Sequence, residues 1–240
     1  MDYGLVVTIL FAFISLFLTV ITLDNRKELK RAAKKLNRIL KEYDEYGVSS
    51  IDHGKMKVQD ANRMFEESII IKMMYISGVN FVRDYRKKIK KSCDNGCKIK
   101  ILLAMPNGVF ITEHDKICKI DCEMNSNTND EIKETIELIK KINEELIPDK
   151  QIEIKYYSTA FRGSLTICYD KENKAKARIS VFAPPELAID SMLLYAEREE
   201  NDKNNKMNLV SRYEKHFDII WNHFSSEPDF DSTLTSDSEY

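Results

Sequence analysis

Three predicted strands are each followed by small, polar or flexible residues of kinds that can bind a phosphate group. The strands end just before Ser77, Asn107 and Ser158. Ligands of open α/β sheets bind outside the carboxyl ends of parallel strands, so these residues are expected at one edge of the sheet. Hydroxyls, amides, main-chain N–H groups and a guanidinium can hold phosphate without a general base. The predicted ligand-binding residues are Ser77, Gly78, Asn80, Asn107, Ser158, Arg162 and Ser164.

The same residue types are also common in turns, so a purely structural role is the alternative interpretation. No enzyme motif accompanies them: the chain has no P-loop, no H-E-x-x-H and no G-x-S-x-G, and its four histidines are scattered. The 37 basic and 39 acidic residues nearly balance, which argues against a global field for duplex DNA. We therefore predict a binding site without catalytic residues, metal or cofactor.

The five cysteines offer one alternative to this prediction. Two C-x3-C pairs, Cys93/Cys97 and Cys118/Cys122, could supply four thiolates to zinc, although the usual spacing is tighter. An odd number of cysteines in a glycine-poor chain favours reduced thiols over a disulfide scaffold.

The elements that must position the polar residues alternate between strands and helices. Predicted strands cover residues 68–76, 98–105, 152–157, 165–169 and 177–182, the last two forming a hairpin. Predicted helices cover 55–67, 80–91, 132–146 and 209–224, and residues 109–129 show no clear pattern. This order predicts an α/β fold with a mixed sheet covered by helices, spanning residues 48–224. The acidic, serine-rich tail 225–240 is expected to be disordered.

The N-terminal segment has the features of a membrane anchor. Residues 3–23 contain no charge and are long enough to cross a bilayer, so a transmembrane helix over 1–23 is predicted. A cleaved signal peptide fits less well, because a basic n-region and an A-x-A site are absent. Residues 24–47 are rich in Lys and Arg and predict a juxtamembrane helix on the cytoplasmic side. The chain is thus expected in the cell (inner) membrane as a single-pass protein, with its N-terminus outside and its domain in the cytoplasm.

The small and hydroxylated residues of the transmembrane segment share one side of the helix. They are Gly4, Thr8, Ala12, Ser15, Thr19 and Thr22. At 100° per residue they fall within an arc of roughly 80°, and the same register continues through apolar residues of the juxtamembrane helix. Such a stripe suits self-association or a pore lining, so a homo-oligomer is predicted. A monomeric anchor packed on its own domain is the alternative.

Two segments resemble phospholipase-D-like domains. The stretch 68–107 reads SIIIKMMYISGVNFVRDYRKKIKKSCDNGCKIKILLAMPN and is similar to the opening half of that fold. FRGSLTICYD at 161–170, followed by a hairpin and a helix ending HFDIIWNHF, is similar to its second part. The resemblance covers about two-thirds of the chain and implies the α/β fold described above. The family motif is H-x-K-x4-D, and with Asp170 as its aspartate, Gly163 takes the histidine position and Leu165 the lysine position.

This departure implies a phosphate-shaped pocket, lined by Arg162 and Ser164, that has lost its nucleophile. The layout resembles membrane effectors of bacterial anti-phage defence, in which a transmembrane segment precedes a cytoplasmic sensor. We therefore expect an effector that binds a nucleotide or short oligonucleotide, made by a cognate signal-producing enzyme, and that oligomerises to form a pore or disrupt the membrane. The alternatives are a tethered phosphodiesterase with an atypical nucleophile such as His114, and an anchored protein-interaction module.

Overall fold

The structure is a computed structural model, and it describes residues 46–53, 57–122, 127–159, 161, 163–181, 192–202 and 207–228. The predicted transmembrane helix, its polar stripe and nearly all of the juxtamembrane helix lie outside these residues, as does most of the tail. Within the described ranges, no helix combines the length and apolar character needed to cross a membrane.

The centre of the domain is an eight-stranded mixed sheet with the order β1-β7-β6-β5-β2-β3-β4-β8. Its strands are β1 (Val48–His53), β2 (Ile70–Tyr75), β3 (Lys98–Ala104), β4 (Glu153–Tyr157), β5 (Gly163–Tyr169), β6 (Ala175–Val181), β7 (Met192–Arg198) and β8 (Ser225–Ser226). Strands β2, β3 and β4 are parallel, and every other neighbouring pair is antiparallel. The mixed α/β fold predicted from the sequence is therefore confirmed.

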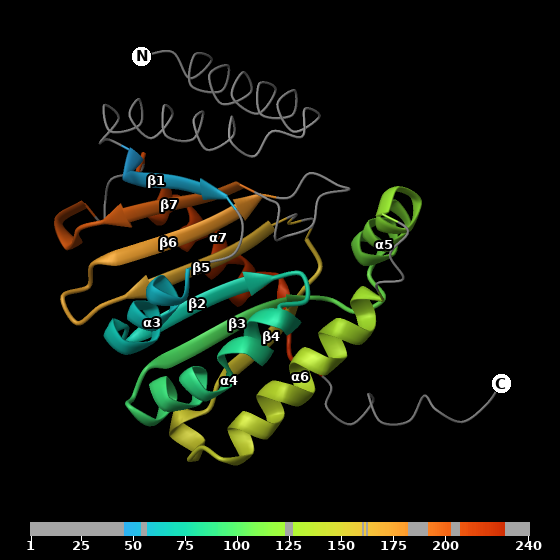
Figure 1. Cartoon of the computed structure of the whole chain (residues 1–240), viewed down its shortest axis with the longest axis horizontal. Helices are drawn as coiled ribbons and strands as arrows, with labels where there is room; N and C mark the ends of the chain where they lie inside the picture. Colours follow the sequence, from blue (N-terminus) through green and yellow to red (C-terminus); the bar gives the residue numbers. More distant parts are fainter. Residues whose placement is uncertain are drawn as a thin grey trace, which may run out of the picture.

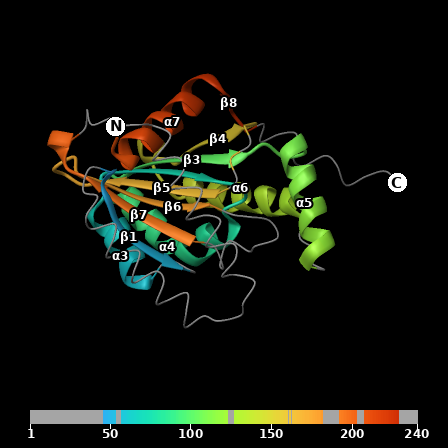
Figure 2. The ribbon, with the colours of Figure 1, turned by 90° about the horizontal axis from the view of Figure 1, so that it is seen from above.

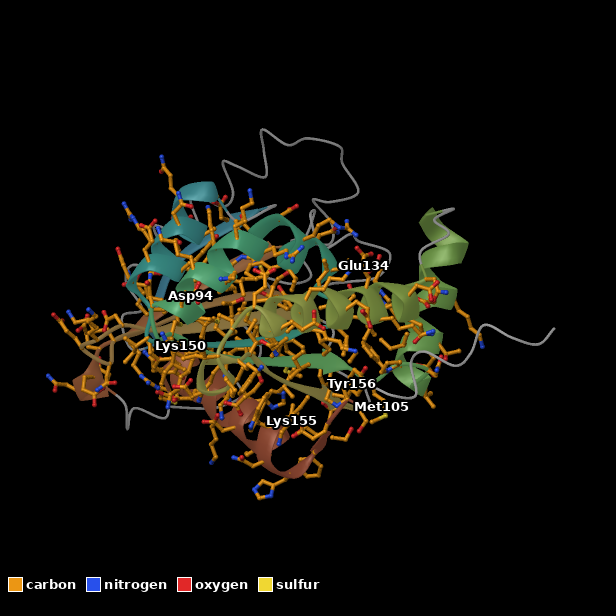
Figure 3. The ribbon with its side chains drawn as sticks, turned by 90° about the horizontal axis from the view of Figure 1, so that it is seen from below. Asp94, Met105, Glu134, Lys150, Lys155 and Tyr156 are labelled. Carbon is orange, nitrogen blue, oxygen red and sulfur yellow. The ribbon has the colours of Figure 1, made fainter. Side chains whose placement is uncertain are left out.

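Helices cover both faces of this sheet (Figure 1). They are α3 (Val58–Glu67), α4 (Val79–Asp94), α5 (Val109–Cys122), α6 (Thr128–Glu144) and α7 (Leu209–His223). Figure 2 shows α7 on one face, whereas α3 and α4 lie on the opposite face, where α6 packs against α4. The last turn of α4 is tied to the segment before β4, since Lys150 Nζ donates to the Asp94 carbonyl oxygen at 2.6 Å (Figure 3).

The hydrophobic pattern of the sequence predicts the core well. Ile132, Ile136, Ile139 and Ile142 recur every three or four residues along α6, and all four are buried. Phe217, Ile220 and Trp221 bury the inner side of α7 against the other face of the sheet. Strand β3 reads as a nearly continuous apolar run because helices cover it on both sides.

Several elements depart from the predictions. Strands β1 and β7 are absent from the predictions because their sequences, VSSIDH and MLLYAER, lack a clear alternating pattern. Residues 109–122 form α5, which was not predicted because its amphipathic pattern is weak. Helix α4 begins at Val79, one residue before the predicted start, because Gly78, with a φ of 72°, occupies the N-cap and turns the chain out of β2. Residues 225–226, in the predicted tail, form β8 and pair with β4.

Candidate functional site

The carboxyl edge of β2, β3 and β4 is where the sequence predicts a phosphate site, and the start of α6 lies against it. Ser77 Oγ donates to Glu131 Oε2 at 2.7 Å, and Thr135 Oγ1 donates to the Ser77 carbonyl oxygen at 2.8 Å. The Asn107 backbone N–H donates to Asn129 Oδ1 at 2.7 Å. Two of the predicted site residues, Ser77 and Asn107, thus attach this edge to α6. The Ser77 hydroxyl already donates its hydrogen bond to the Glu131 carboxylate.

The other described residues of the predicted site lie near the same edge. Asn80 is exposed and accepts a hydrogen bond from Arg83, and Ser158 is exposed after β4. Tyr156 of β4 and Met105 after β3 lie at this end of the sheet (Figure 3). Ser164 is only 9% exposed, and Arg162 lies outside the described residues. Binding of a ligand by this set stays a prediction.

The resemblance to phospholipase D assigns Gly163 and Leu165 to the histidine and lysine positions, and both residues are closely packed. A Cβ atom at Gly163 would lie 2.2 Å from the Ser180 carbonyl oxygen and 3.3 Å from the Phe161 ring. Leu165 is fully buried on the face covered by α7. Asp170 lies at the far end of β5, where its Oδ1 accepts from the N–H groups of Glu172 and Lys174. Asp170 therefore shapes the β5–β6 turn.

A cavity of about 200 Å³, with several charged side chains in its lining, lies elsewhere, between α3 and strands β5, β6 and β7. Two rows of register partners form its floor: Thr166, Arg178 and Tyr195 in one row, and Cys168, Lys176 and Glu197 in the next. Side chains two residues apart on a strand point to the same face, so both rows face α3.

One charged side of α3 forms the opposite wall. Asp60, Arg63, Met64 and Glu67 have the spacing i, i+3, i+4, i+7 and all line the cavity. The neighbouring Ala61 and Phe65 are buried and attach the helix to the sheet. The cavity thus combines basic and acidic side chains, with hydroxyls on its floor.

Arg178 is the central cation of the floor. It is half-buried, its Nε has no hydrogen-bond partner among the described residues, and no described carboxylate lies within ion-pair distance of it. Burial raises the pKa of Tyr75 to about 12, while the charge of Arg178 and the 2.7 Å hydrogen bond with Thr166 oppose this rise. Burial also raises the pKa of Tyr195, again opposed by Arg178. Arg178 therefore lies among tyrosine and threonine hydroxyls.

Sequence reasoning missed this cavity for identifiable reasons. Lys176 and Arg178 alternate with apolar residues along β6, which is also the pattern of an ordinary solvent-facing strand. The charged side of α3 looks equally like a solvated helix face. Only the pairing of β6 with the unpredicted β7 brings Tyr195 and Glu197 beside them.

The cysteines do not form a metal centre in the described part of the chain, which contains no cluster of three or more potential metal ligands. Burial raises the pKa values of Cys93 and Cys168 to about 12, so both thiols are protonated near neutral pH. The side chains of Cys118 and Cys122 lie outside the described residues.

Solved structures that are similar to this chain include TrmBL2 and Nuc. TrmBL2, an archaeal chromatin protein, has 17% sequence identity and a TM-score of 0.42, with 91% of this chain and 69% of TrmBL2 covered. Nuc from Salmonella typhimurium, a phospholipase D family member, has 12% identity and a TM-score of 0.41, with 75% of this chain and 97% of Nuc covered. No protein-family model and no curated protein matches the sequence. One structural neighbour is thus a phospholipase D family member, and membership of that family stays a prediction.

Proposed function

We propose that this protein is a membrane-anchored effector whose cytoplasmic domain binds a phosphate-bearing ligand without hydrolysing it. Assembly of its N-terminal helices forms a pore or disrupts the membrane, in the manner of anti-phage defence effectors. The observation that carries the binding role is the state of the two motif positions. Gly163 has no room for a side chain, and Leu165 is buried in the core.

A phosphodiesterase of the phospholipase D type needs a nucleophile and a cation at the scissile phosphate. Neither can be restored at Gly163 or Leu165 without moving the backbone of β6 or the contacts of α7. Arg178 nevertheless leaves a positive charge on the opposite face of the same strands, in a cavity large enough for a small ligand. Binding without turnover is the function that this combination supports.

The connection between the domain and its predicted anchor supports a signalling role. Strand β1 starts directly after the predicted juxtamembrane helix and pairs with β7, which lines the cavity. The Gly47 carbonyl oxygen accepts from the Glu197 N–H at 2.7 Å, and Ser49 Oγ donates to the Tyr195 carbonyl oxygen at 3.2 Å. A ligand in the cavity would therefore act on the strand that leads to the membrane, provided that it binds one assembly better than another.

The test of the effector role changes the polar stripe. In Ser15→Leu with Thr19→Leu, hydrophobicity rises, so the segment should insert, but the polar side of the helix is lost. We expect most of the toxicity and dye leakage of cells expressing the wild-type chain to disappear. The matched control is Val6→Leu with Phe17→Leu, on the opposite side of the helix, which should leak like wild type. Equal leakage from both double variants would contradict a pore lined by the stripe.

The two alternatives predict different results. An enzyme would hydrolyse a phosphodiester such as bis(p-nitrophenyl) phosphate and lose this activity in His114→Ala. His114 lies on α5 with its ring stacked on Phe110, at a centroid distance of 6.3 Å, and does not line the cavity. An anchored interaction module would keep its function when residues 3–23 are replaced by an unrelated hydrophobic helix, whereas the effector would lose it.

A further inference from the structure

We propose that the cavity between α3 and strands β5–β7 is the ligand site, that Arg178 is its anchor, and that it takes a small phosphate monoester and excludes an oligonucleotide. This inference rests on the proposed function and specifies where, and in what form, the ligand binds. It moves the site away from the carboxyl edge of β2–β4, where Ser77 and Asn107 already hold α6.

The first argument is the missing counter-charge. A guanidinium offers five N–H donors, and a half-buried one is costly to keep unless an anion accepts from it. Lys72 on the same sheet shows the usual solution: its Nζ lies 2.7 Å from Asp218 Oδ1 and 3.6 Å from Glu214 Oε1. In the described residues Arg178 has no such carboxylate. A bound phosphate would accept the forked pair of hydrogen bonds that suits a guanidinium.

The second argument is the ring of hydroxyls around this cation. Thr166 and Tyr195 flank Arg178 in the same row of the sheet, and Tyr75 shares a hydrogen bond with Thr166. Hydroxyls can donate to phosphate oxygens without adding charge, and burial keeps both tyrosines protonated at neutral pH. Hydroxyl-bearing side chains from β5 and β7 thus lie on either side of Arg178 in the floor of the cavity.

The third argument limits the size and charge of the ligand. A cavity of about 200 Å³ holds a phosphate with part of a small attached group. The carboxylates of Asp60, Glu67 and Glu197 line the same cavity and would repel a second phosphate. They would instead accept hydrogen bonds from the remainder of the ligand, such as a ribose or an amine. A mononucleotide fits these limits, and a chain of phosphates does not.

The test uses the full chain purified in detergent, with inorganic phosphate, adenosine 5′-monophosphate and the dinucleotide pApA as probes of thermal stability. Phosphate and the monophosphate should raise the melting temperature of the wild type, with pApA giving at most a weak shift. Arg178→Gln should weaken monophosphate binding by about 10-fold to 100-fold, the usual effect of losing a charged hydrogen bond. Arg83→Gln is the matched control, since Arg83 is exposed and paired with Glu134 on the far side of α4.

The melting temperature without ligand separates a functional from a structural arginine. If Arg178 is kept for a ligand, Arg178→Gln should melt at the wild-type temperature or above it, because an uncompensated charge is removed. A lower melting temperature together with an unchanged ligand response would overturn the assignment of Arg178. An equal response to pApA and the monophosphate would overturn the size limit.

A second measurement does not depend on any variant. Phenylglyoxal modifies arginine side chains, and peptide mass spectrometry reports each site separately. The monophosphate should slow modification of Arg178 severalfold in the wild type and leave Arg83 unchanged. If the wild type binds the probes but Arg178 is not protected, the cavity assignment fails and the proposed function survives. If phosphate does not change the melting temperature of the wild type, both the cavity assignment and the proposed ligand sensing are contradicted.

Discussion

Two arginines on opposite faces of the same half-sheet have opposite environments. Arg198 on β7 faces α7, its side chain is 1% exposed, and its Nη1 donates to Glu214 and to Ser211. Arg178 on β6 faces α3, is half-buried, and lacks a carboxylate among the described residues. The protein pairs one guanidinium with its own acidic side chain and leaves the other for an outside anion, although the Nε of each has no hydrogen-bond partner among the described residues. Burial alone therefore does not identify a functional cation, whereas the absence of a counter-ion does.

The largest effect is expected when the completed pair is broken. Glu214→Gln keeps the shape of the side chain but leaves Arg198 buried without its counter-charge, which typically costs about 3–5 kcal/mol. The melting temperature of the full chain should fall by many degrees, whereas Arg178→Gln should cause no such fall. Equal losses in the two variants would remove the distinction between the faces.

Acid should weaken the same pair. Burial tends to raise the pKa of Glu214, but the hydrogen bond from Arg198 and the charges of Arg198 and Lys72 outweigh burial and lower this pKa below its usual 4.5. A carboxyl group with a lowered folded-state pKa adds stability above its unfolded-state value and loses it as the pH falls through the folded-state value. The difference in melting temperature between wild type and Glu214→Gln should thus be full at pH 7 and shrink below about pH 4.5. A difference that stays constant down to pH 3 would contradict ionisation of Glu214 as its source.

A smaller effect is expected at the carboxyl edge of β2–β4. Thr135 is fully buried, and Thr135→Val removes the donor to the Ser77 carbonyl oxygen while keeping the side-chain shape. The expected cost is about 1–2 kcal/mol, with no change in monophosphate affinity. A loss of affinity without a loss of stability would instead place the ligand at the edge, as the sequence alone predicts. Thr128→Val, at another buried α6 threonine whose hydroxyl donates to Asp115 of α5 and not to a strand end, provides the comparison.

The sequence predicts the layered fold because hydrophobic periodicity records which side of an element is buried. Ile132 and Ile139 mark the inner side of α6, and the apolar run of β3 marks a central strand. The cavity depends on information of another kind. Arg178 and Tyr195 lie 17 positions apart, on strands whose pairing no local pattern reveals, and Glu67 reaches them only through the placement of α3. Strand ends carry a local signal and can be predicted, but pairing of distant strands cannot be read from spacing alone.

The smallest effect is expected when a carboxylate that lines the cavity is removed. This change should be favourable, because it should raise ligand affinity, whereas removing Glu214 on the α7 face should lower stability. Glu67 is exposed in the last turn of α3, so Glu67→Gln removes a negative charge near the bound phosphate and leaves the fold intact. Monophosphate affinity should rise about twofold to fivefold at low salt, and the gain should shrink in 0.5 M salt, because exposed charges are screened. Glu66→Gln, the neighbouring exposed residue that does not line the cavity, should change affinity much less. Removing a carboxylate on the α7 face would then destabilise the protein, as expected for a structural ion pair. Removing one on the α3 face would raise ligand affinity, as expected for an open anion site.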